Sequence, residues 1–437
     1  MTNILIDGYN LGLERGTGVA TYARNLSYEL KALGHHVSVL YGNRAAPSRE
    51  ALMREIAFFD DNVGERNRWL EILDQAHRAV LGPLGHFATE VPISGKVITR
   101  TFSARLPAYD HILNAIDVFK RSQSAFKLWN SLSTVTVPQK PDLVHWTYPV
   151  PLRIKRVPNI YTLHDLVPLR LPYTTLDKKR TYLGLMRQIV KTADHVVTVS
   201  ECSRRDIIDL LGIAPERVTN TYQSVSIPEK YRNKSELQIA REVEGAAGVG
   251  YKDYFLFWGS IEPKKNIGRM IEAYLSSGVD TPLVIVGAQA WKSEQELRQL
   301  DDDIIRYLTI ANGQIRAKKR IIQLSYAPFS LLVSLIRGAK AALFPSLYEG
   351  FGLPALEAML LGTPVICSNT ASLPEVVGDA AMMVDPYDPA AISVAIRTLD
   401  ADADLRTELV RRGLCAAARF TPEIYRGNLQ ALYSRFI

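Results

Sequence analysis

Short apolar segments alternate with amphipathic helical segments along residues 254–368, and no other feature limits the fold of this chain as strongly. A short apolar run suits a strand that is buried on both faces of a parallel sheet, and a helix between two such strands provides the crossover. The predicted strands are 254–259, 282–287, 320–326, 341–345 and 364–368. The predicted helices are 266–276, 293–310, 329–337 and 354–361. The pattern predicts a doubly wound α/β domain.

The first half of the chain begins with the same kind of unit. A strand at 3–7 is followed by a glycine-rich loop, a helix at 19–33 that ends at Gly34, and a second strand at 36–42. Glycine after the last helical turn is a common helix stop, and the order strand, loop, helix, strand is typical of a parallel sheet. Further apolar runs that we interpret as strands lie at 143–146, 159–163 and 195–199. Two such domains place a ligand in the cleft between the carboxyl ends of their strands.

A polar segment at 226–249 separates the two series of strands and helices. The chain has 437 residues, which exceeds the usual size of one domain. We therefore expect a first Rossmann-like domain at 1–230 and a second at 231–419. A final helix is expected at 420–437, where a threonine cap is followed by proline.

The composition is that of an ordinary globular protein, with 47% hydrophobic and 22% charged residues. No apolar run approaches the roughly 20 residues that span a bilayer, and the first ten residues do not resemble a signal peptide. The three cysteines, Cys202, Cys367 and Cys415, are far apart and form no CxxC pair. We expect a cytoplasmic protein that does not cross a membrane and has neither a disulfide framework nor a zinc site.

The net charge of +7 is confined to the first half of the chain. Residues 1–230 hold 29 Lys and Arg against 22 Asp and Glu, whereas residues 231–437 hold 23 of each. Within the first half, residues 153–191 contain nine basic side chains and only two acidic ones, Asp165 and Asp177. A local basic excess of this kind indicates an anionic partner.

Residues 48–140 show the least regular pattern. Within them, residues 107–132 place apolar side chains among Lys120, Arg121 and Lys127, which predicts an amphipathic helix with a basic flank. Such a helix either packs on its own domain, which we favour, or lies on a membrane surface.

The segment around Glu349 and Glu357 carries the clearest chemical signal. A buried strand is followed by a loop loosened by Gly350 and Gly352, and then by a helix that opens with Pro354. The start of such a helix carries partial positive charge and binds phosphate through backbone N–H groups. Glu349 lies on the loop at the carboxyl end of the strand and Glu357 one turn into the helix, so we expect them to contact the hydroxyl groups of different parts of one ligand.

Two lysines and a glycine are further candidates for contact with phosphate. Lys264 and Lys265 lie between a predicted strand and a helix, where two ammonium groups can surround a diphosphate. Gly18, after the first strand, allows the backbone to approach a phosphate or a sugar closely. Gly16, in the same loop, is expected only to shape the turn. Taken alone, the lysines would be a solvated turn.

These segments resemble the retaining GT-B glycosyltransferases of family 4. The resemblance rests on a glutamate, seven residues and a second glutamate in a strand, loop and helix context, and it covers nearly the whole chain except residues 48–140. The other matching segments are TGVATY (17–22), TLHD (162–165), VSECSR (199–204), GSIEPKKN (259–266) and SLPEVVGDAA (372–381) followed by VDP (384–386). The family often has arginine where Lys264 stands, and some members have arginine at Ser260.

The resemblance implies roles for particular residues. It implies that Glu349, Lys265 and His164 are the catalytic residues, with Glu349 and His164 in contact with the transferred sugar and Lys265 on the diphosphate. It further implies that Glu357 accepts hydrogen bonds from the ribose. The implied donor-binding residues are Gly18, Lys264, Lys265, Glu349, Gly350, Phe351, Gly352, Leu353 and Glu357. A solvated helix carboxylate is the alternative for Glu357.

The implied fold is GT-B, in which two Rossmann-like domains face a central cleft and the C-terminal helix crosses back to the first domain. Segments 17–26 and 162–170 resemble bacterial mannosyltransferases of lipopolysaccharide, capsule or exopolysaccharide assembly, so GDP-mannose is the expected donor. A UDP- or ADP-sugar donor, a phosphorylase or epimerase of the same fold, and a non-catalytic carbohydrate-binding scaffold remain alternatives.

The expected partners are the nucleotide sugar, a glycan or polyprenyl-linked acceptor and an anionic membrane surface, with the protein peripheral at the inner face of the plasma membrane. No cofactor or metal is expected, because the acidic clusters at 301–303 and 400–404 do not follow strands and the two lysines can neutralise the diphosphate. No motif for nucleic-acid binding is present.

Overall fold

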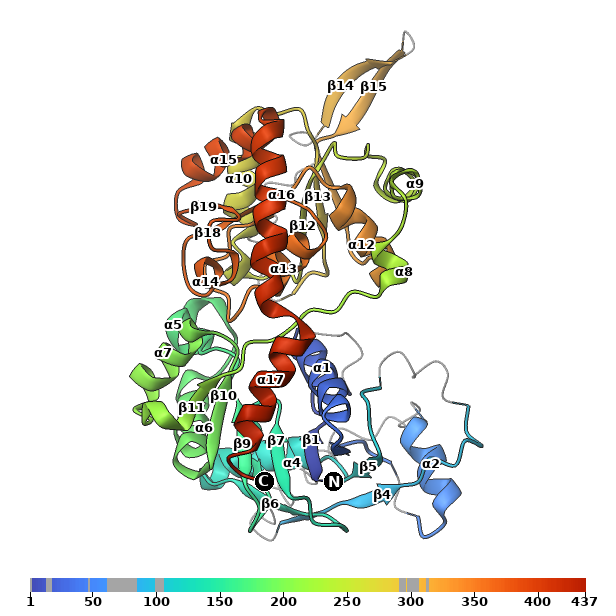
Figure 1. Cartoon of the computed structure of the whole chain (residues 1–437), viewed down its shortest axis with the longest axis vertical. Helices are drawn as coiled ribbons and strands as arrows, with labels where there is room; N and C mark the ends of the chain where they lie inside the picture. Colours follow the sequence, from blue (N-terminus) through green and yellow to red (C-terminus); the bar gives the residue numbers. More distant parts are fainter. Residues whose placement is uncertain are drawn as a thin grey trace.

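We describe the protein from a computed structural model of the chain. The description covers residues 2–12, 18–45, 48–60, 85–98, 106–290, 296, 306–311 and 314–437, with backbone only for 306–319. Figure 1 shows two lobes stacked along the longest axis, each built around its own sheet.

The first lobe contains a sheet in the order β11-β10-β9-β7-β1-β2-β5-β4. Neighbouring strands are parallel except for β4 and β5. The strand bounds are β1 Asn3–Asp7, β2 His36–Tyr41, β4 Thr89–Val91, β5 His111–Asn114, β7 Leu143–Trp146, β9 Asn159–Thr162, β10 His195–Thr198 and β11 Val218–Asn220. The short strands β3 His86–Phe87, β6 Ser133–Thr136 and β8 Leu152–Arg153 form a separate small sheet.

The second lobe contains a parallel sheet in the order β16-β13-β12-β17-β18-β19. Its strands are β12 Phe255–Trp258, β13 Leu283–Val286, β16 Ile321–Leu324, β17 Ala341–Phe344, β18 Val365–Ser368 and β19 Met382–Val384. Numbered along the chain, this is the order 3-2-1-4-5-6 of a Rossmann sheet, and the first lobe shares it from β5 to β10. The prediction of two Rossmann-like α/β domains is confirmed.

Helices connect the strands and cover the sheets. The helices of the first lobe are α1 Gly18–Ala32, α2 Ala51–Phe59, α4 Val118–Trp129, α5 Val167–Arg170, α6 Lys179–Thr192 and α7 Glu201–Leu211. Those of the connection and the second lobe are α8 Glu229–Arg232, α9 Glu236–Ala247, α10 Ile267–Ser277, α12 Phe329–Gly338, α13 Leu353–Leu360, α14 Leu373–Val377, α15 Pro389–Ala401 and α16 Ala403–Ala417. Short 3-10 turns are η2 Pro172–Thr174, η3 Pro215–Arg217, η4 Pro263–Lys265 and η6 Ala418–Phe420. In the described part of the chain, no helix is long and apolar enough to span a bilayer.

The last helix, α17 Pro422–Tyr433, leaves the second lobe and lies on the first, beside α1 (Figure 1). An ion pair of 2.8 Å joins Arg426 of α17 to Glu29 of α1. Deeper in the first lobe, the Tyr433 hydroxyl lies 2.6 Å from Nδ1 of His145 on β7. The chain therefore crosses between the lobes twice, once after β11 and once at η6.

The prediction of one helix at 107–132 is wrong in its first part. Residues His111–Asn114 form strand β5, and the helix α4 begins only at Val118. Asp117, at the start of α4, has a left-handed φ of 51°, which interrupts any continuous helix. The short run of Ile112 and Leu113 is buried between β2 and β4, where a strand and a buried helix carry the same apolar pattern.

The predicted helix at 293–310 is also wrong at its end. Strand β14, Arg306–Ala311, pairs antiparallel with β15, Gln314–Lys319, and this hairpin projects from the second lobe (Figure 1). Residues 293–295 and 297–305 of the predicted helix lie outside the described part of the chain. The sequence has the dipeptide Asn-Gly at 312–313, which is typical of a two-residue β-hairpin turn. This signal predicts a hairpin more strongly than the apolar periodicity predicts a helix.

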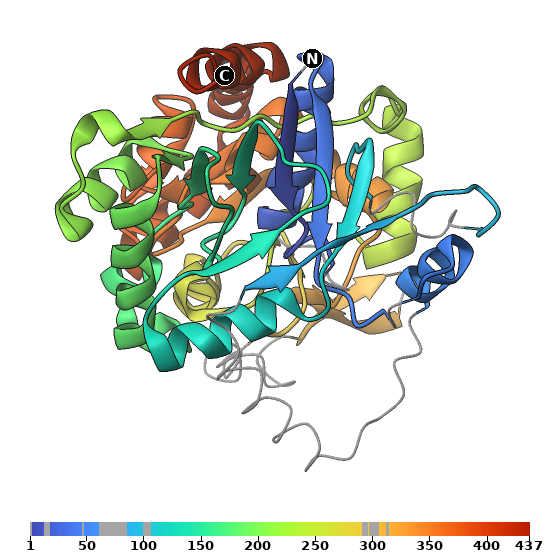
Figure 2. The ribbon, with the colours of Figure 1, turned by 90° about the horizontal axis from the view of Figure 1, so that it is seen from below.

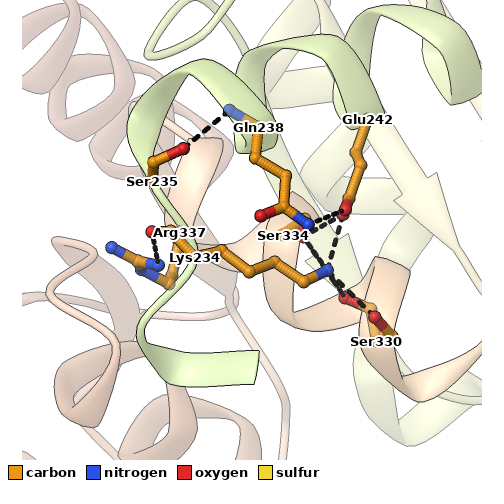
Figure 3. Close-up of polar contacts among 7 residues, drawn as sticks. All are labelled: Lys234, Ser235, Gln238, Glu242, Ser330, Ser334 and Arg337. Carbon is orange, nitrogen blue, oxygen red and sulfur yellow. Dashed lines mark hydrogen bonds and ion pairs between the residues drawn. The ribbon is translucent and has the colours of Figure 1, made fainter. Parts of the chain in front are cut away.

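The connection between the lobes is fixed to the second lobe by a buried lysine. Lys234 Nζ donates to Glu242 on α9 at 2.6 Å, and to the hydroxyls of Ser330 and Ser334 on α12 at 2.9 Å and 2.8 Å (Figure 3). Arg337 Nη1 donates to the Lys234 carbonyl at 2.7 Å. The charged Lys234 side chain can be buried because its N–H groups have hydrogen-bond acceptors. The connecting segment therefore has a firm attachment before α9 begins.

Candidate active site

Two facing sheet edges place the predicted site residues together. In each Rossmann-like sheet the strand order reverses beside the first strand, between β1 and β7 and between β12 and β17. Ligands bind outside the carboxyl ends of the strands at such a point. Loops from both lobes meet there, since a Cβ atom added to Gly18 would lie 3.8 Å from Leu353 Cδ1 of the other lobe.

Gly350 lies close to the first lobe at this cleft. A Cβ atom at Gly350 would lie 3.0 Å from both the carbonyl oxygen of His164 and Oδ2 of Asp165. A side chain at this position would require the His164 carbonyl and the Asp165 carboxylate to shift. Gly352 has φ +102° and caps α13, and a Cβ there would meet Leu373 at 2.8 Å. Gly352 is needed for the backbone path of this loop, and Gly350 for the space between the loop and the first lobe.

An ion pair occupies the centre of the second lobe's half of the site. Lys265 Nζ lies 2.7 Å from Glu349 Oε1, and Lys264 Nζ lies 3.6 Å from Glu262 Oε1. The backbone N–H of Leu347 donates to the Lys264 carbonyl at 2.8 Å, which ties the lysine turn to the loop after β17. The structure thus brings Lys264, Lys265 and Glu349 together from segments about 80 residues apart in sequence.

The Glu349 carboxyl and the Lys264 amine are both held in their charged forms. Burial alone would raise the pKa of Glu349, but Lys265 and Lys264 outweigh it, and the pKa of this carboxyl lies below its usual value. Burial works against the charge on Lys264, yet Asp165, Glu262 and Glu349 raise the pKa of this lysine. Asp165 belongs to the first lobe, so the charge of Lys264 is stabilised from across the cleft.

Glu357 has a different environment. It lies on α13, and its Oε2 accepts a hydrogen bond of 3.0 Å from the indole Nε1 of Trp258. Burial raises the pKa of Glu357 to about 7, and the indole N–H lowers it only in part. This carboxyl is therefore not a solvated helix residue, as the alternative interpretation had it. Trp258 was not among the predicted site residues, although its position at the end of β12 is a signal that could have found it.

His164 lies on the first lobe's side of the cleft, after β9. Its Nε2 donates to the Thr147 carbonyl at 2.9 Å, and because a carbonyl only accepts, Nδ1 is the nitrogen without a proton. Burial lowers the pKa of His164, which keeps the imidazole neutral. The ring of Tyr22 packs edge-on against it with ring centroids 4.7 Å apart. The carboxylate of the neighbouring Asp165 accepts from the N–H of Val167 at 3.1 Å.

A chain of buried hydrogen bonds runs from Tyr22, whose ring packs against this histidine, to the C-terminal helix. The Tyr22 hydroxyl lies 3.0 Å from Thr162 Oγ1, which lies 2.7 Å from His145 Nε2. His145 in turn contacts Tyr433 of α17. Burial lowers the pKa of His145 to about 3, so this histidine is neutral as well. His145 and Tyr433 lie in none of the segments that carry the family resemblance, and their contact arises only when α17 lies on the first lobe.

Gly16 and the acidic cluster at 301–303 lie outside the described residues. At the second acidic cluster, Asp400 pairs with Lys340 at 2.8 Å and Asp402 caps α16. Across the described ranges, no group of three His, Cys, Asp or Glu side chains could hold a metal ion.

Sequence comparisons match each half of the chain to a glycosyltransferase family. The family model "Glycosyltransferase Family 4" matches residues 16–226, and "Glycosyl transferases group 1" matches residues 246–414. The O-antigen chain mannosyltransferase B of Escherichia coli is 34% identical over 283 residues, which are 63% of this chain and 69% of that protein. The O-antigen chain mannosyltransferase RfbU of Salmonella typhimurium is 29% identical over 239 residues, 55% of this chain and 60% of that protein.

Structural comparisons give the same fold along the whole chain. Sucrose-phosphate synthase from Thermosynechococcus elongatus superimposes with a TM-score of 0.65 at 16% identity, covering 100% of this chain and 99% of the other. Anabaena HepE in complex with UDP and glucose superimposes with a TM-score of 0.62 at 15% identity, covering 100% of both chains. With its two Rossmann-like lobes and both family matches, the chain belongs to the family 4, group 1 glycosyltransferases of the GT-B fold.

Proposed function

We propose that this protein transfers mannose from GDP-mannose to a hydroxyl group of a glycan or polyprenyl-linked acceptor, with retention of the anomeric configuration and without a metal ion. The observation that carries the proposal is the Lys265–Glu349 pair, which lies 2.7 Å apart at the end of the second lobe's sheet in a chain related to O-antigen mannosyltransferases. These relatives support a role in the assembly of cell-surface polysaccharide. The proposed location is the cytoplasm, with peripheral attachment at the inner face of the plasma membrane.

Each site residue has a task in this proposal. Lys264 and Lys265 neutralise the diphosphate as the bond from the sugar to its phosphate oxygen breaks, which favours the transition state over the bound donor. Glu349 accepts hydrogen bonds from sugar hydroxyls, and neutral His164 contacts the sugar from the other lobe. Because two ammonium groups already balance the leaving group, no metal is required for that purpose. Glu357 accepts hydrogen bonds from the ribose hydroxyls through Oε1, because its Oε2 already accepts one from Trp258.

The donor is tested by a thermal-shift panel of GDP, UDP and ADP sugars, followed by transfer assays. GDP-mannose is expected to raise the melting temperature most, because a ligand that binds only the folded state stabilises it. Transfer should require a lipid-linked acceptor, resist EDTA and give an α-linked product by NMR. A larger shift with a UDP- or ADP-sugar would make that sugar the donor in place of GDP-mannose. Turnover of the donor alone would indicate a phosphorylase or epimerase. No shift with any nucleotide sugar would favour a non-catalytic scaffold.

We propose that an anionic membrane binds this protein at the surface where α4 meets α6. At the end of α4, Leu128 and Trp129 are 57% and 51% exposed. Helix α6 lies beside this end, since a Cβ atom at Gly184 would be 3.3 Å from Asn130 Oδ1, and Figure 2 shows the two helices along one edge of the lobe. The exposed basic residues on these two segments are Lys120, Lys127, Lys178, Arg180, Arg187 and Lys191. Exposed tryptophan and leucine among basic side chains fit an anionic bilayer surface.

Neutralising part of this charge is expected to weaken membrane binding. The triple variant Lys178→Ser, Arg180→Ser and Arg187→Ser removes about 3 kcal/mol of attraction, at about 1 kcal/mol for each basic side chain. Its affinity for vesicles with anionic lipid should therefore be lower by about 10²-fold. Co-sedimentation with vesicles of graded anionic content and salt measures this. Arg411→Ser, on the exposed face of α16, removes a basic charge away from this surface and should bind as the wild type does. Binding that ignores both anionic lipid and salt would contradict the proposal.

A further inference from the structure

Helix α7 of the first lobe contacts the loop of the second lobe on both sides of Glu349. The hydroxyl of Tyr348 donates to Oδ2 of Asp206, and the hydroxyl of Ser203 donates to the Gly350 carbonyl at 3.2 Å. Tyr348 and Gly350 are the direct neighbours of Glu349 in the chain. The position of Glu349 is therefore coupled to a helix that belongs to the other lobe.

Asp206 is well placed to hold this contact. It is only 5% exposed, and its other oxygen, Oδ1, accepts a hydrogen bond of 2.9 Å from Arg170 Nε on α5. The arginine keeps the nearly buried carboxylate oriented and balances its charge. Burial, together with the hydrogen bond to Asp206, raises the pKa of Tyr348, so this hydroxyl stays protonated and remains a donor.

A second contact fixes the start of α7 to the second lobe. The Glu375 carboxylate on α14 accepts hydrogen bonds from the backbone N–H groups of Glu201 at 2.8 Å and Cys202 at 3.2 Å. The next N–H, that of Ser203, donates to Ser200 Oγ at 3.0 Å within the first lobe. Two of the first three N–H groups of α7 thus have their acceptor in the other lobe, where a negative charge also interacts favourably with the helix dipole.

We infer that α7 is a positioning element for the transfer reaction. Asp206 on α7, and Glu375 on α14 at the start of α7, align Glu349 of the second lobe with His164 of the first when the lobes are together. The inference rests on the proposed transferase function and extends it to residues outside the donor site. Misplacement of a reacting group by about 1 Å costs on the order of 10²-fold in rate. Loss of these contacts should therefore reduce kcat, while the nucleotide, which is bound by the second lobe, still binds.

Two conservative variants test the inference, each with a matched control. Tyr348→Phe removes only the hydroxyl that Asp206 accepts, and Tyr254→Phe removes a buried hydroxyl that bonds the Leu335 carbonyl within the second lobe. Glu375→Gln weakens a carboxylate cap between lobes, and Asp388→Asn weakens a carboxylate cap of α15 within the second lobe. We expect Tyr348→Phe and Glu375→Gln to lower kcat by about 10- to 100-fold with donor KM within about twofold, and the controls to keep kcat.

Hydrogen exchange provides a readout that does not depend on activity. The amides of Glu201 and Cys202 should exchange faster in Glu375→Gln than in Asp388→Asn, and the thermal shift by the nucleotide sugar should be retained in every variant. Equal kcat values for variants and controls, or unchanged exchange at these two amides, would overturn the inference. If the wild type binds no nucleotide sugar, the proposed function fails and this inference with it, whereas an active wild type with unaffected Tyr348→Phe and Glu375→Gln overturns the inference alone.

Discussion

Replacing Glu349 or Lys265 by alanine should abolish sugar transfer, with a loss of at least roughly 10²- to 10³-fold in kcat. Glu349 and Lys265 form a close ion pair at the end of the second lobe's sheet, and each is expected to contact a part of the donor where charge or bonding changes in the transition state. The measurement is the initial rate of transfer to a lipid-linked acceptor at saturating donor. Wild-type-like turnover in either variant would contradict the site assignment.

The stability of these variants must be measured beside their activity. Each alanine leaves the other charge of a largely buried pair without its partner, which costs about 3–5 kcal/mol in the free energy of unfolding. The double variant Glu349→Gln with Lys265→Met removes both charges at similar volume, so we expect it to recover stability but not activity. An inactive double variant with a wild-type melting temperature would place the loss in the chemistry, whereas recovered activity would show that the single variants had only failed to fold.

The alternation of short apolar and amphipathic segments was sufficient to predict two Rossmann-like domains. Apolar strands that are buried on two faces are distinct in sequence when helices separate them. The alternation failed at residues 111–114 and 306–310, where a strand and a helix share the same apolar pattern. At 107–132, the left-handed residue Asp117 decides the outcome, and nothing in its residue type requires that conformation. The placement of β5 depends instead on the neighbouring strands β2 and β4.

The site shows the same division between local and long-range information. Lys264, Lys265, Glu349 and the glycines after β17 are in short motifs, and the fold brings them to one sheet edge. Trp258, Thr147 and Asp206 carry no motif. Their roles arise from contacts with residues between 17 and 142 positions away, so they become visible only once the strand order and the contact between the lobes are known.

Replacing Glu357 by glutamine should make the empty protein more stable at pH 8 and its nucleotide binding weaker. Burial raises the pKa of Glu357 from 4.5 to about 7. The folded state therefore holds this proton more tightly than the unfolded state, and stability falls as the pH rises from 4.5 to about 7. Above that range the buried charge destabilises the fold by on the order of 1–3 kcal/mol, which glutamine removes while it still accepts the Trp258 hydrogen bond.

The same carboxylate is proposed to accept the ribose hydroxyls, and hydrogen bonds to a charged acceptor contribute about 1.5–3 kcal/mol. Glu357→Gln should therefore weaken nucleotide binding by roughly 10- to 100-fold at pH 8. In the wild type, affinity should fall as the pH drops below about 7, because the protonated acid is a poorer acceptor. Calorimetric titration with GDP at pH 5.5, 7 and 8 measures both effects.

Glu349 cannot account for such a pH dependence, because its pKa lies below the usual value and it stays ionised throughout this range. Wild type and Glu357→Gln should therefore converge in both stability and affinity at pH 5.5 and differ most at pH 8. Equal pH profiles for the two proteins would remove Glu357 from the ribose contact. A gain in stability at pH 8 without a loss of affinity would mean that the buried charge serves no ligand, and the cost of keeping a carboxylate at this position would then have no functional reason.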